Sequence, residues 1–338
     1  MYIGGDRLNR FLYISFALFM MIITSGCGMT VLDPEGTVGE QQRDLIILSI
    51  TFMLIIVLVV LILLTYFLVK YRERDGHRGY DPNIDGSVKL EVIWTAIPIA
   101  IVTVLSIPTV YTIFNIEEVP EASTENEEPL VVHATSSNWM WIFSYPEEDI
   151  ETINYLNIPV DRPVLFKLTS ADSMASFWVP QLGGQRYNMA GMETELYLQA
   201  GTEGTYYGRN ANYTGEGFAE MRFDVNAIEE SAFNEWVADV QEDAPELTQG
   251  IYDQFMVPGH VDEYTFSGTH LEWVDHAIDA EYAMEAWERE GYEPMNPHAS
   301  DAPDGVPRLD IDVEAGSVET EDTQNEETPQ EQDSHHHH

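Results

Sequence analysis

The sequence is poor in cysteine and in basic residues, and both shortages exclude classes of protein. It has one cysteine, Cys27, so no disulfide can form within the chain, and zinc or iron–sulfur sites built from several cysteines are excluded. Lys and Arg together number 15 against 58 Asp and Glu, which gives a formal net charge of −43. Nucleic acid repels a chain of this charge, so we expect no nucleic-acid partner.

Familiar catalytic and metal motifs are also missing. The histidines before residue 299 stand singly, without the spacing of a metal-binding pair. The chain has no phosphate loop, dinucleotide fingerprint or nucleophile elbow. The closing run His335–His338 is given no role.

The negative charge is concentrated in one part of the chain. Residues 115–338 contain 7 basic and 48 acidic side chains, whereas residues 1–114 contain 8 basic and 10 acidic ones. Concentrated salt screens such self-repulsion, so a saline or alkaline habitat is one hypothesis. The alternative is that an acidic tail, residues 299–338, inflates the count.

The first 26 residues have the composition of a secretion signal. Arg7 and Arg10 precede an apolar run that is too short to span a bilayer. The run ends at "TSGC", and small residues before a lone cysteine are typical of a bacterial lipoprotein signal. Cleavage would leave Cys27 as an acylated N-terminus, followed by a short external segment, residues 27–44. The alternative is an ordinary cysteine inside a retained helix.

Two longer apolar runs predict transmembrane helices. Residues 45–69 and 92–114 contain no charged side chain and are long enough to span a bilayer. Five of the fifteen basic residues lie between them, in residues 70–91. The positive-inside rule places this loop in the cytoplasm and everything after residue 115 outside the cell. A lipidated Cys27 would lie on the same outer side.

The exported part is predicted to be mainly β-structure. Short alternating or apolar runs, separated by glycine and proline, indicate a β-sandwich or barrel over residues 115–230. We expect seven strands: 130–137, 139–145, 164–170, 176–182, 193–200, 204–210 and 219–227. Helical spacing in residues 231–298 predicts a helical extension, with Phe233, Trp236 and Val237 on one helix face. Residues 299–338 are acidic and are predicted to be disordered.

Three motifs resemble subunit II of the haem–copper terminal oxidases. They are "SSNWMWIFSYP" at 136–146, "SADSMASFWVPQLGGQ" at 170–185 and "GTYYGRNANYTGEGFAEM" at 204–221. The resemblance extends over residues 27–298. It implies a membrane-anchored α+β chain, in which two transmembrane helices precede an extracellular cupredoxin-like β-sandwich with a helical C-terminal extension.

The copper ligands of that family are replaced here. Its cytochrome c oxidases hold a dinuclear copper centre through a histidine before "SFWVP" and through a loop that reads C-x-E-x-C-x-x-x-H-x-x-M. Met221 is the one ligand that this sequence retains. The other positions hold Ala175, Asn210, Asn212, Thr214 and Phe218. Copper of this kind requires thiolate and imidazole, so the resemblance implies no copper centre in this chain.

Loss of these ligands is typical of the quinol oxidase branch, and the fuller motifs look most like the Bacillus-type menaquinol oxidases. The resemblance implies a proton-translocating complex that reduces oxygen to water, with haem and copper in subunit I and with subunits III and IV as further partners. Menaquinol would be the electron donor of the complex, and this chain would bind no cofactor.

One acidic residue is given a role by the resemblance. "LEVIWTAIP" at 90–98 resembles a family motif in which Glu91 matches a carboxylate at the cytoplasmic mouth of a proton-uptake channel. A carboxylate at the membrane boundary can collect and pass protons. The alternative is that Glu91 only marks the start of a helix.

The sequence leaves two other functions open. One is a cytochrome c oxidase subunit II with an atypical copper site, which bound copper would reveal. The other is a free-standing cupredoxin-like lipoprotein without an oxidase partner. Two proline-containing spans argue against the latter, because a lipid anchor needs none.

Overall fold

The computed structural model describes residues 30–72, 86–120, 128–293, 306–311, 313 and 318–321. The predicted signal segment and Cys27 lie outside these residues, as does most of the predicted cytoplasmic loop. The end of the acidic tail, with His335–His338, lies outside them too.

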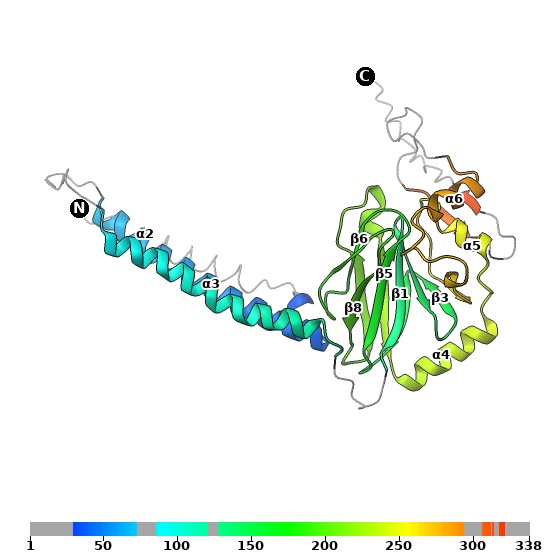
Figure 1. The fold of residues 1–338 in the computed structure, drawn as a ribbon, viewed down its shortest axis with the longest axis horizontal. Coiled ribbons are helices and arrows are strands. Elements are labelled where there is room, and N and C mark those ends of the chain that lie inside the picture. The colour runs from blue at the N-terminus through cyan, green and yellow to red at the C-terminus, as the bar shows by residue number, and fades with distance from the viewer. Residues whose placement is uncertain are drawn as a thin grey trace, which may run out of the picture.

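Two long helices form a hairpin that projects from a β-sandwich (Figure 1). A short 3-10 turn, η1 (Thr30–Leu32), precedes α2 (Thr37–Lys70), and α3 (Val88–Ile116) runs back beside it. Both are long and apolar enough to cross a membrane, and they are apolar on all faces rather than amphipathic. They include the predicted spans and extend past both ends of each. Pro98 and Pro108 lie inside α3.

The hairpin is joined to the sandwich by backbone hydrogen bonds. The amide of Glu35 donates to the carbonyl of Gln181 at 2.9 Å, and the amide of Gly39 donates to that of Leu182 at 3.1 Å. A side chain at Gly36 would meet the Gln199 carbonyl oxygen at 2.1 Å, so only glycine permits this close approach. The outer end of α2 is therefore held against the sandwich.

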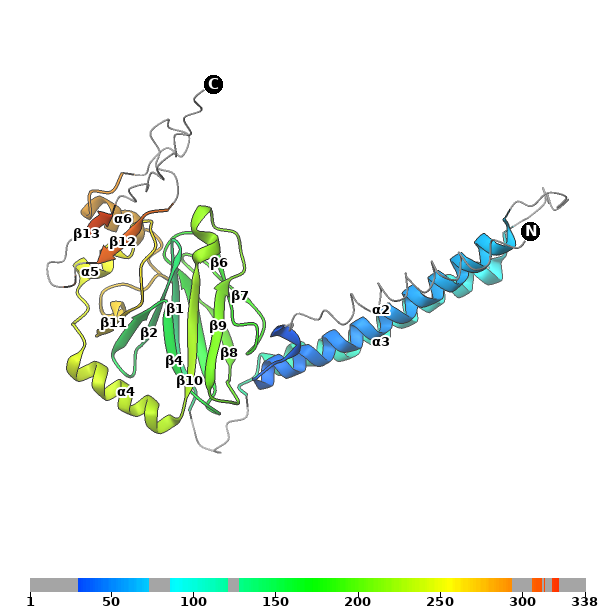
Figure 2. The ribbon, with the colours of Figure 1, turned by 180° about the vertical axis from the view of Figure 1, so that it is seen from behind.

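The sandwich consists of a six-stranded and a five-stranded sheet. The first has the order β11-β3-β2-β1-β5-β8: Tyr264–Ser267, Ile150–Ile153, Met140–Tyr145, Leu130–Ser137, Val164–Ser170 and Thr194–Leu198. The second, nearer the viewer in Figure 2, has the order β4-β10-β9-β6-β7: Tyr155–Pro159, Arg222–Ile228, Gly204–Asn210, Ala175–Trp178 and Arg186–Asn188.

Aromatic side chains fill the space between the sheets. Trp141 and Phe143 from β2 meet Phe177 from β6 and Phe223 from β10, with ring centroids 5.0–6.4 Å apart. All four are at most 2% exposed. This packing of inward-facing aromatics holds the two sheets in a fixed relation.

The C-terminal extension packs against the six-stranded sheet. It contains α4 (Glu230–Asp243), α5 (Gln249–Gln254), a 3-10 turn η3 (His270–Glu272) and α6 (Tyr282–Arg289). Helix α4 packs against the core between the sheets, and α5 and α6 pack against the opposite face. Phe233 is buried and Trp236 and Val237 pack on the sandwich core, which confirms the predicted helix face. Figure 1 shows α5 and α6 on the side of the sandwich away from the hairpin.

The extension is not purely helical, contrary to the prediction. Its strand β11 pairs antiparallel with β3 and becomes an edge of the six-stranded sheet. In addition, β12 (Arg308–Ile311) pairs with β13 (Val318–Glu321), within the segment predicted to be disordered. Leu309 and Ile311 are buried in a second apolar cluster with residues of the extension, which explains why this stretch is ordered.

All seven expected strands occur, three with the predicted bounds (β1, β5 and β9) and four with shifted ends, and the sandwich has four others that the sequence does not predict. The segment 176–182 is a strand only to Trp178, because Pro180 cannot donate to a sheet. The additional strands β3, β4, β7 and β11 have five residues or fewer. Only Asn154, in the left-handed region at φ 61°, separates β3 from β4, so the sequence pattern does not divide them into two strands of different sheets.

Candidate functional site

The six positions of the family's copper ligands come together at one end of the five-stranded sheet. Ala175 begins β6, Asn210 ends β9, and the register places Phe177 opposite Asn210. The chain then turns through residues 211–215 into a 3-10 helix, η2 (Glu216–Glu220), and returns at Met221 to start β10. Backbone hydrogen bonds close the loop from Asn210 to Met221 and from Ala211 to Ser176, at 3.1 and 2.9 Å.

The side-chain amide of Asn210 holds this loop together. Its Oδ1 accepts hydrogen bonds from the backbone amides of Ser176 and Asn212, both at 2.9 Å. Its Nδ2 donates to Thr214 Oγ1 at 3.2 Å and to Met221 Sδ at 3.1 Å. The residue is 1% exposed. Every hydrogen-bonding position of the amide is therefore used inside the protein.

The other positions are also committed to structural contacts. Asn212 donates through Nδ2 to the Met174 carbonyl at 2.7 Å, and the Thr214 carbonyl accepts from Trp139 Nε1 at 3.1 Å. Phe218 packs against the exposed ring of Tyr213, with centroids 5.6 Å apart. Ala175 is buried and pairs with Asn188 in the sheet.

This donor set does not fit copper. Amides, a hydroxyl, a methyl and a phenyl group supply no thiolate or imidazole, and one thioether is too weak a ligand alone. The Met221 sulfur already accepts from Asn210. Within the described residues, no group of three or more His, Cys, Asp or Glu side chains is placed to hold a metal ion.

An indole and an imidazole cover the far side of the loop. The ring of Trp139 lies 6.0 Å from that of His260, which comes from the extension, and both border Gly217. A side chain at Gly217 would meet the Trp139 ring at 2.4 Å. Burial lowers the pKa of His260 in spite of Glu220, whose carboxylate lies 3.6 Å away. The imidazole here serves packing between the loop and the extension.

Glu91 lies in the first turn of α3, where its carboxylate is exposed. The backbone amide of Glu91 donates to the Ser87 carbonyl at 3.0 Å and so begins the helix. An acidic residue at this end of a helix interacts favourably with the helix dipole. No other described side chain is recorded in contact with its carboxylate.

A buried polar cluster lies between the six-stranded sheet and the extension, and the sequence does not predict it. Glu151 Oε2 accepts from Ser144 Oγ and His270 Nδ1, both at 2.7 Å, and from the His270 backbone amide at 3.0 Å. None of the three residues is more than 1% exposed. Ser144 and Glu151 lie on neighbouring strands, and Glu151 is 119 residues from His270, so no local pattern indicates the contact.

Two aromatic residues extend this cluster. The ring of Tyr252 stacks on His270 at 4.5 Å, and its hydroxyl lies 2.7 Å from His276 Nε2. Burial, followed by the charge of His270, lowers the pKa of His276 to about 3. Burial also raises the pKa of Tyr252 well above its usual value, so this hydrogen bond joins a neutral hydroxyl and a neutral imidazole.

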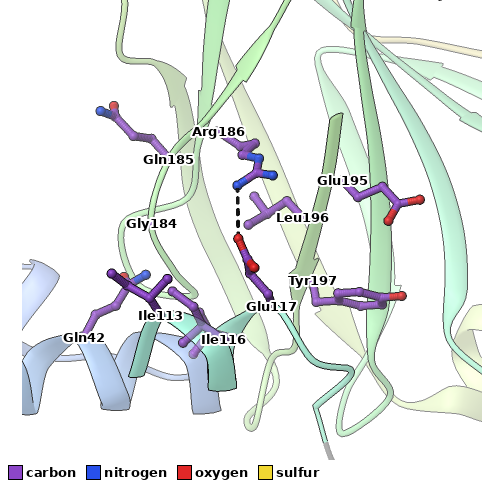
Figure 3. A pocket seen from close by; sticks show the side chains of 11 residues that line it. Gln42, Ile113, Ile116, Glu117, Gly184, Gln185, Arg186, Glu195, Leu196 and Tyr197 are labelled. Carbon is purple, nitrogen blue, oxygen red and sulfur yellow. Dashed lines mark ion pairs between the residues drawn. The ribbon is translucent and has the colours of Figure 1, made fainter. Parts of the chain in front are cut away.

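A second polar site lies where the hairpin meets the sandwich (Figure 3). This cavity has a volume of about 420 Å³ and is enclosed by the outer ends of α2 and α3 and by β7 and β8. Arg186 points toward Glu117, with 4.0 Å between the guanidinium and the carboxylate. Ile113 and Ile116 form the apolar side of the cavity.

Family models match both parts of the chain. The model described as cytochrome C oxidase subunit II, transmembrane domain, matches residues 27–111, and the one for the periplasmic domain matches residues 147–228. The first therefore covers the helical hairpin. The second covers β3 to β10 and the whole loop around Asn210.

Curated relatives extend the likeness to nearly the whole chain. The quinol oxidase subunit 2 of Bacillus spizizenii is 60% identical over 300 residues, which is 88% of this chain and 93% of the relative. The protein of the same name in Bacillus subtilis is 59% identical over the same shares. Among solved structures, the periplasmic domain of subunit II of Bradyrhizobium japonicum cytochrome oxidase matches 37% of this chain and 98% of its own, with 23% identity and a TM-score of 0.34. The chain belongs to the family of subunit II of the haem–copper quinol oxidases.

Proposed function

We propose that this chain is the copper-free subunit II of a menaquinol oxidase. The complex would take electrons from a membrane-soluble quinol, reduce oxygen to water and move protons outward. The observation that carries the proposal is the Asn210 amide, which uses all its hydrogen bonds where a copper centre would need thiolate. The names of the relatives, quinol oxidase subunit 2, support a quinol as donor.

The proposed role of the chain within the complex is structural. Haem and copper would belong to subunit I, against which the apolar faces of α2 and α3 would pack, with subunits III and IV completing the assembly. The large apolar side chains along much of these helices are exposed in the chain alone, most of them by more than half, which supports a membrane or helical neighbour.

The proposed topology places the β-sandwich outside the cell membrane. The basic residues between the two spans would lie in the cytoplasm, and acylation of Cys27 would add a lipid anchor on the outer side. Glu91 would then lie at the cytoplasmic membrane boundary, where its carboxylate would collect protons for subunit I.

Replacement of Glu91 by glutamine, Glu91→Gln, removes this carboxylate. The variant complex should consume oxygen more slowly than the wild type while it retains its assembled haem.

Oxygen uptake by the purified complex tests the function. With a reduced menaquinol analogue the complex should consume oxygen, and with ferrocytochrome c alone it should not. The copper-to-haem ratio should correspond to the oxygen-reducing site alone. Uptake with ferrocytochrome c together with additional copper would instead favour a cytochrome c oxidase with an atypical copper site.

The partner assignment has a separate test. A tag on this chain should recover haem protein from membranes solubilised in a mild detergent. Recovery of the chain without haem would favour the free-standing lipoprotein, although the membership of the family in both its membrane and exported parts weighs against that alternative.

A further inference from the structure

A second cavity at the hairpin–sandwich junction has an apolar wall and one positive charge. Its volume is about 600 Å³, within the range of small-molecule sites. Its walls come from η1, from two turns of α2, from β6 with the loop after it, and from β9. The apolar wall includes Ile46, Ile50, Trp178 and Pro180, and the positive charge is that of Arg209.

Arg209 is unusual among the basic residues of the exported part. Five of these seven residues lie within 4.0 Å of a carboxylate: Arg162, Lys167, Arg186, Arg289 and Arg308. No such ion pair is recorded for Arg209 among the described residues. Its guanidinium lies over the Trp178 ring at 5.8 Å, and its Nε donates to the adjacent Asn210 carbonyl at 3.4 Å.

The exception is notable because this part of the chain has 48 acidic side chains. The seventh basic residue, Arg222, borders a cavity with Glu220, Asp224 and Asp262, so carboxylates surround it. Within the part of the chain that the structure describes, no acidic residue lines the cavity of Arg209. Its positive charge therefore remains available to an anion from outside the chain.

The cavity lies where the membrane helix leaves the bilayer. Ile46 and Ile50 belong to the uncharged stretch of α2, whereas Arg209 and Trp178 belong to the sandwich. A ligand that fills the cavity must be apolar at the membrane end and anionic at the sandwich end. Tryptophan and arginine at this depth are suited to the head-group region of a bilayer.

We propose that this cavity binds one anionic phospholipid from the surrounding leaflet. Its acyl chain would lie along Ile46 and Ile50 and beneath Trp178, and its phosphate would accept hydrogen bonds from Arg209. The inference depends on α2 crossing the membrane and not on the choice of electron donor, so it can fail while the proposed oxidase function stands.

Photolabelling of the whole oxidase tests this site. The complex is placed in phosphatidylcholine vesicles that contain phosphatidylglycerol with a diazirine in its acyl chain, irradiated and digested. Label is expected in peptides that contain residues 46–50 and 178–181. Unlabelled phosphatidylglycerol should compete, and additional phosphatidylcholine should not. Arg209→Gln should lower this labelling about tenfold, the effect of losing one charge-assisted hydrogen bond.

Matched variants test whether the label depends on Arg209 and on the open cavity. Arg186→Gln removes the same charge at the neighbouring cavity and should leave the label unchanged, whereas Ile50→Trp fills the cavity and should reduce it. Haem recovered with the tagged chain checks that each variant assembles. Equal labelling of wild type and Arg209→Gln would overturn the proposal. A second outcome would also overturn it: label that appears in the Cys27→Ala variant, which cannot be acylated at that residue, but not in the wild type. The acyl group of the chain itself would then occupy the cavity.

Discussion

The Asn210 side chain cross-links the loop at the end of the five-stranded sheet. Its four hydrogen bonds reach β6, the loop after β9 and Met221, so one amide joins three segments of chain. A buried amide is stable only when its groups are paired, and here they are. Thr214 and Met221 are therefore both held by the Asn210 side chain.

Asn210→Ala is expected to destabilise the exported part by about 2–4 kcal/mol, because the amides of Ser176 and Asn212 would lose their acceptor in a buried place. Urea unfolding of the full chain in detergent, followed by circular dichroism, measures this. Asn212→Ala is the control, since its side chain makes one recorded hydrogen bond near the surface. It should cost less than about 1 kcal/mol. Equal losses would argue against the role of Asn210.

Acid should unfold the exported part through one half-buried and one buried histidine, His133 and His276. Burial is the main cause, and the charge of Lys167 the second, that lowers the pKa of His133 to about 4. Burial likewise lowers the pKa of His276 to about 3. In the unfolded chain both titrate near ~6.5. Below pH ~6.5 the folded state therefore binds fewer protons than the unfolded chain. The free energy of unfolding is unaffected by these histidines above that pH, and it decreases as the pH falls toward 4 for His133 and toward 3 for His276.

Each histidine contributes at most ~1.4 kcal/mol per pH unit in this window. His276→Gln should therefore flatten the fall in unfolding midpoint between pH 6 and pH 4. The midpoint is measured by tryptophan fluorescence of the chain in detergent. An unchanged slope would show that His276 is protonated in the folded protein.

Among the structural elements, the extension is attached to the sandwich both by buried side-chain hydrogen bonds and by strand pairing. The antiparallel pair β3–β11 supplies backbone hydrogen bonds, and the Glu151 cluster lies beneath it. Asp253 in α5 accepts from Arg289 and Tyr282 of α6 at 2.6 and 2.7 Å, which joins the two helices. The extension is thus part of the sandwich rather than a separate domain.

Glu151→Ala is expected to loosen the extension first. It would leave His270 and Ser144 buried without their shared acceptor, at a cost of about 3–5 kcal/mol. Limited proteolysis should then cut residues 231–293 faster than in wild type. Glu147→Ala removes an exposed carboxylate from the turn before β3 and serves as control. Identical cleavage of the two variants would contradict the role of Glu151.

At the scale of the molecule, charge and membrane anchoring divide the protein in two. The hairpin is nearly free of charge along its spans, while almost all of the net charge of −43 lies in the exported part. Self-repulsion of this kind weakens a compact state, and salt screens it. The acidic surface thus suits a salty exterior.

The urea midpoint of the chain in detergent should rise when KCl is raised from 0.01 to 1 M, because the Debye length falls from ~30 to ~3 Å. An uncharged osmolyte at equal osmolality is the control for solvent exclusion. A midpoint that falls with KCl would mean that attractive ion pairs outweigh the repulsion.

Three features follow directly from the amino-acid sequence: the two apolar helices, the β-rich exported part and the loss of the family's copper ligands. Each of these depends on residue types or on local periodicity, which require no knowledge of distant contacts. The sequence prediction of a helical extension was wrong in part, because β11 has four residues and becomes a strand only when it pairs with β3, more than 100 residues away.

The contacts of the site residues, in contrast, depend on how the whole chain folds. The fold brings Ala175 and Asn210 to one sheet end, gives the Asn210 amide four partners, and buries Glu151 against His270. It also leaves Arg209 beside an apolar cavity at the membrane boundary. These features depend on which side chains meet after the chain folds, and burial and pairing are properties of that arrangement rather than of any local run of residues.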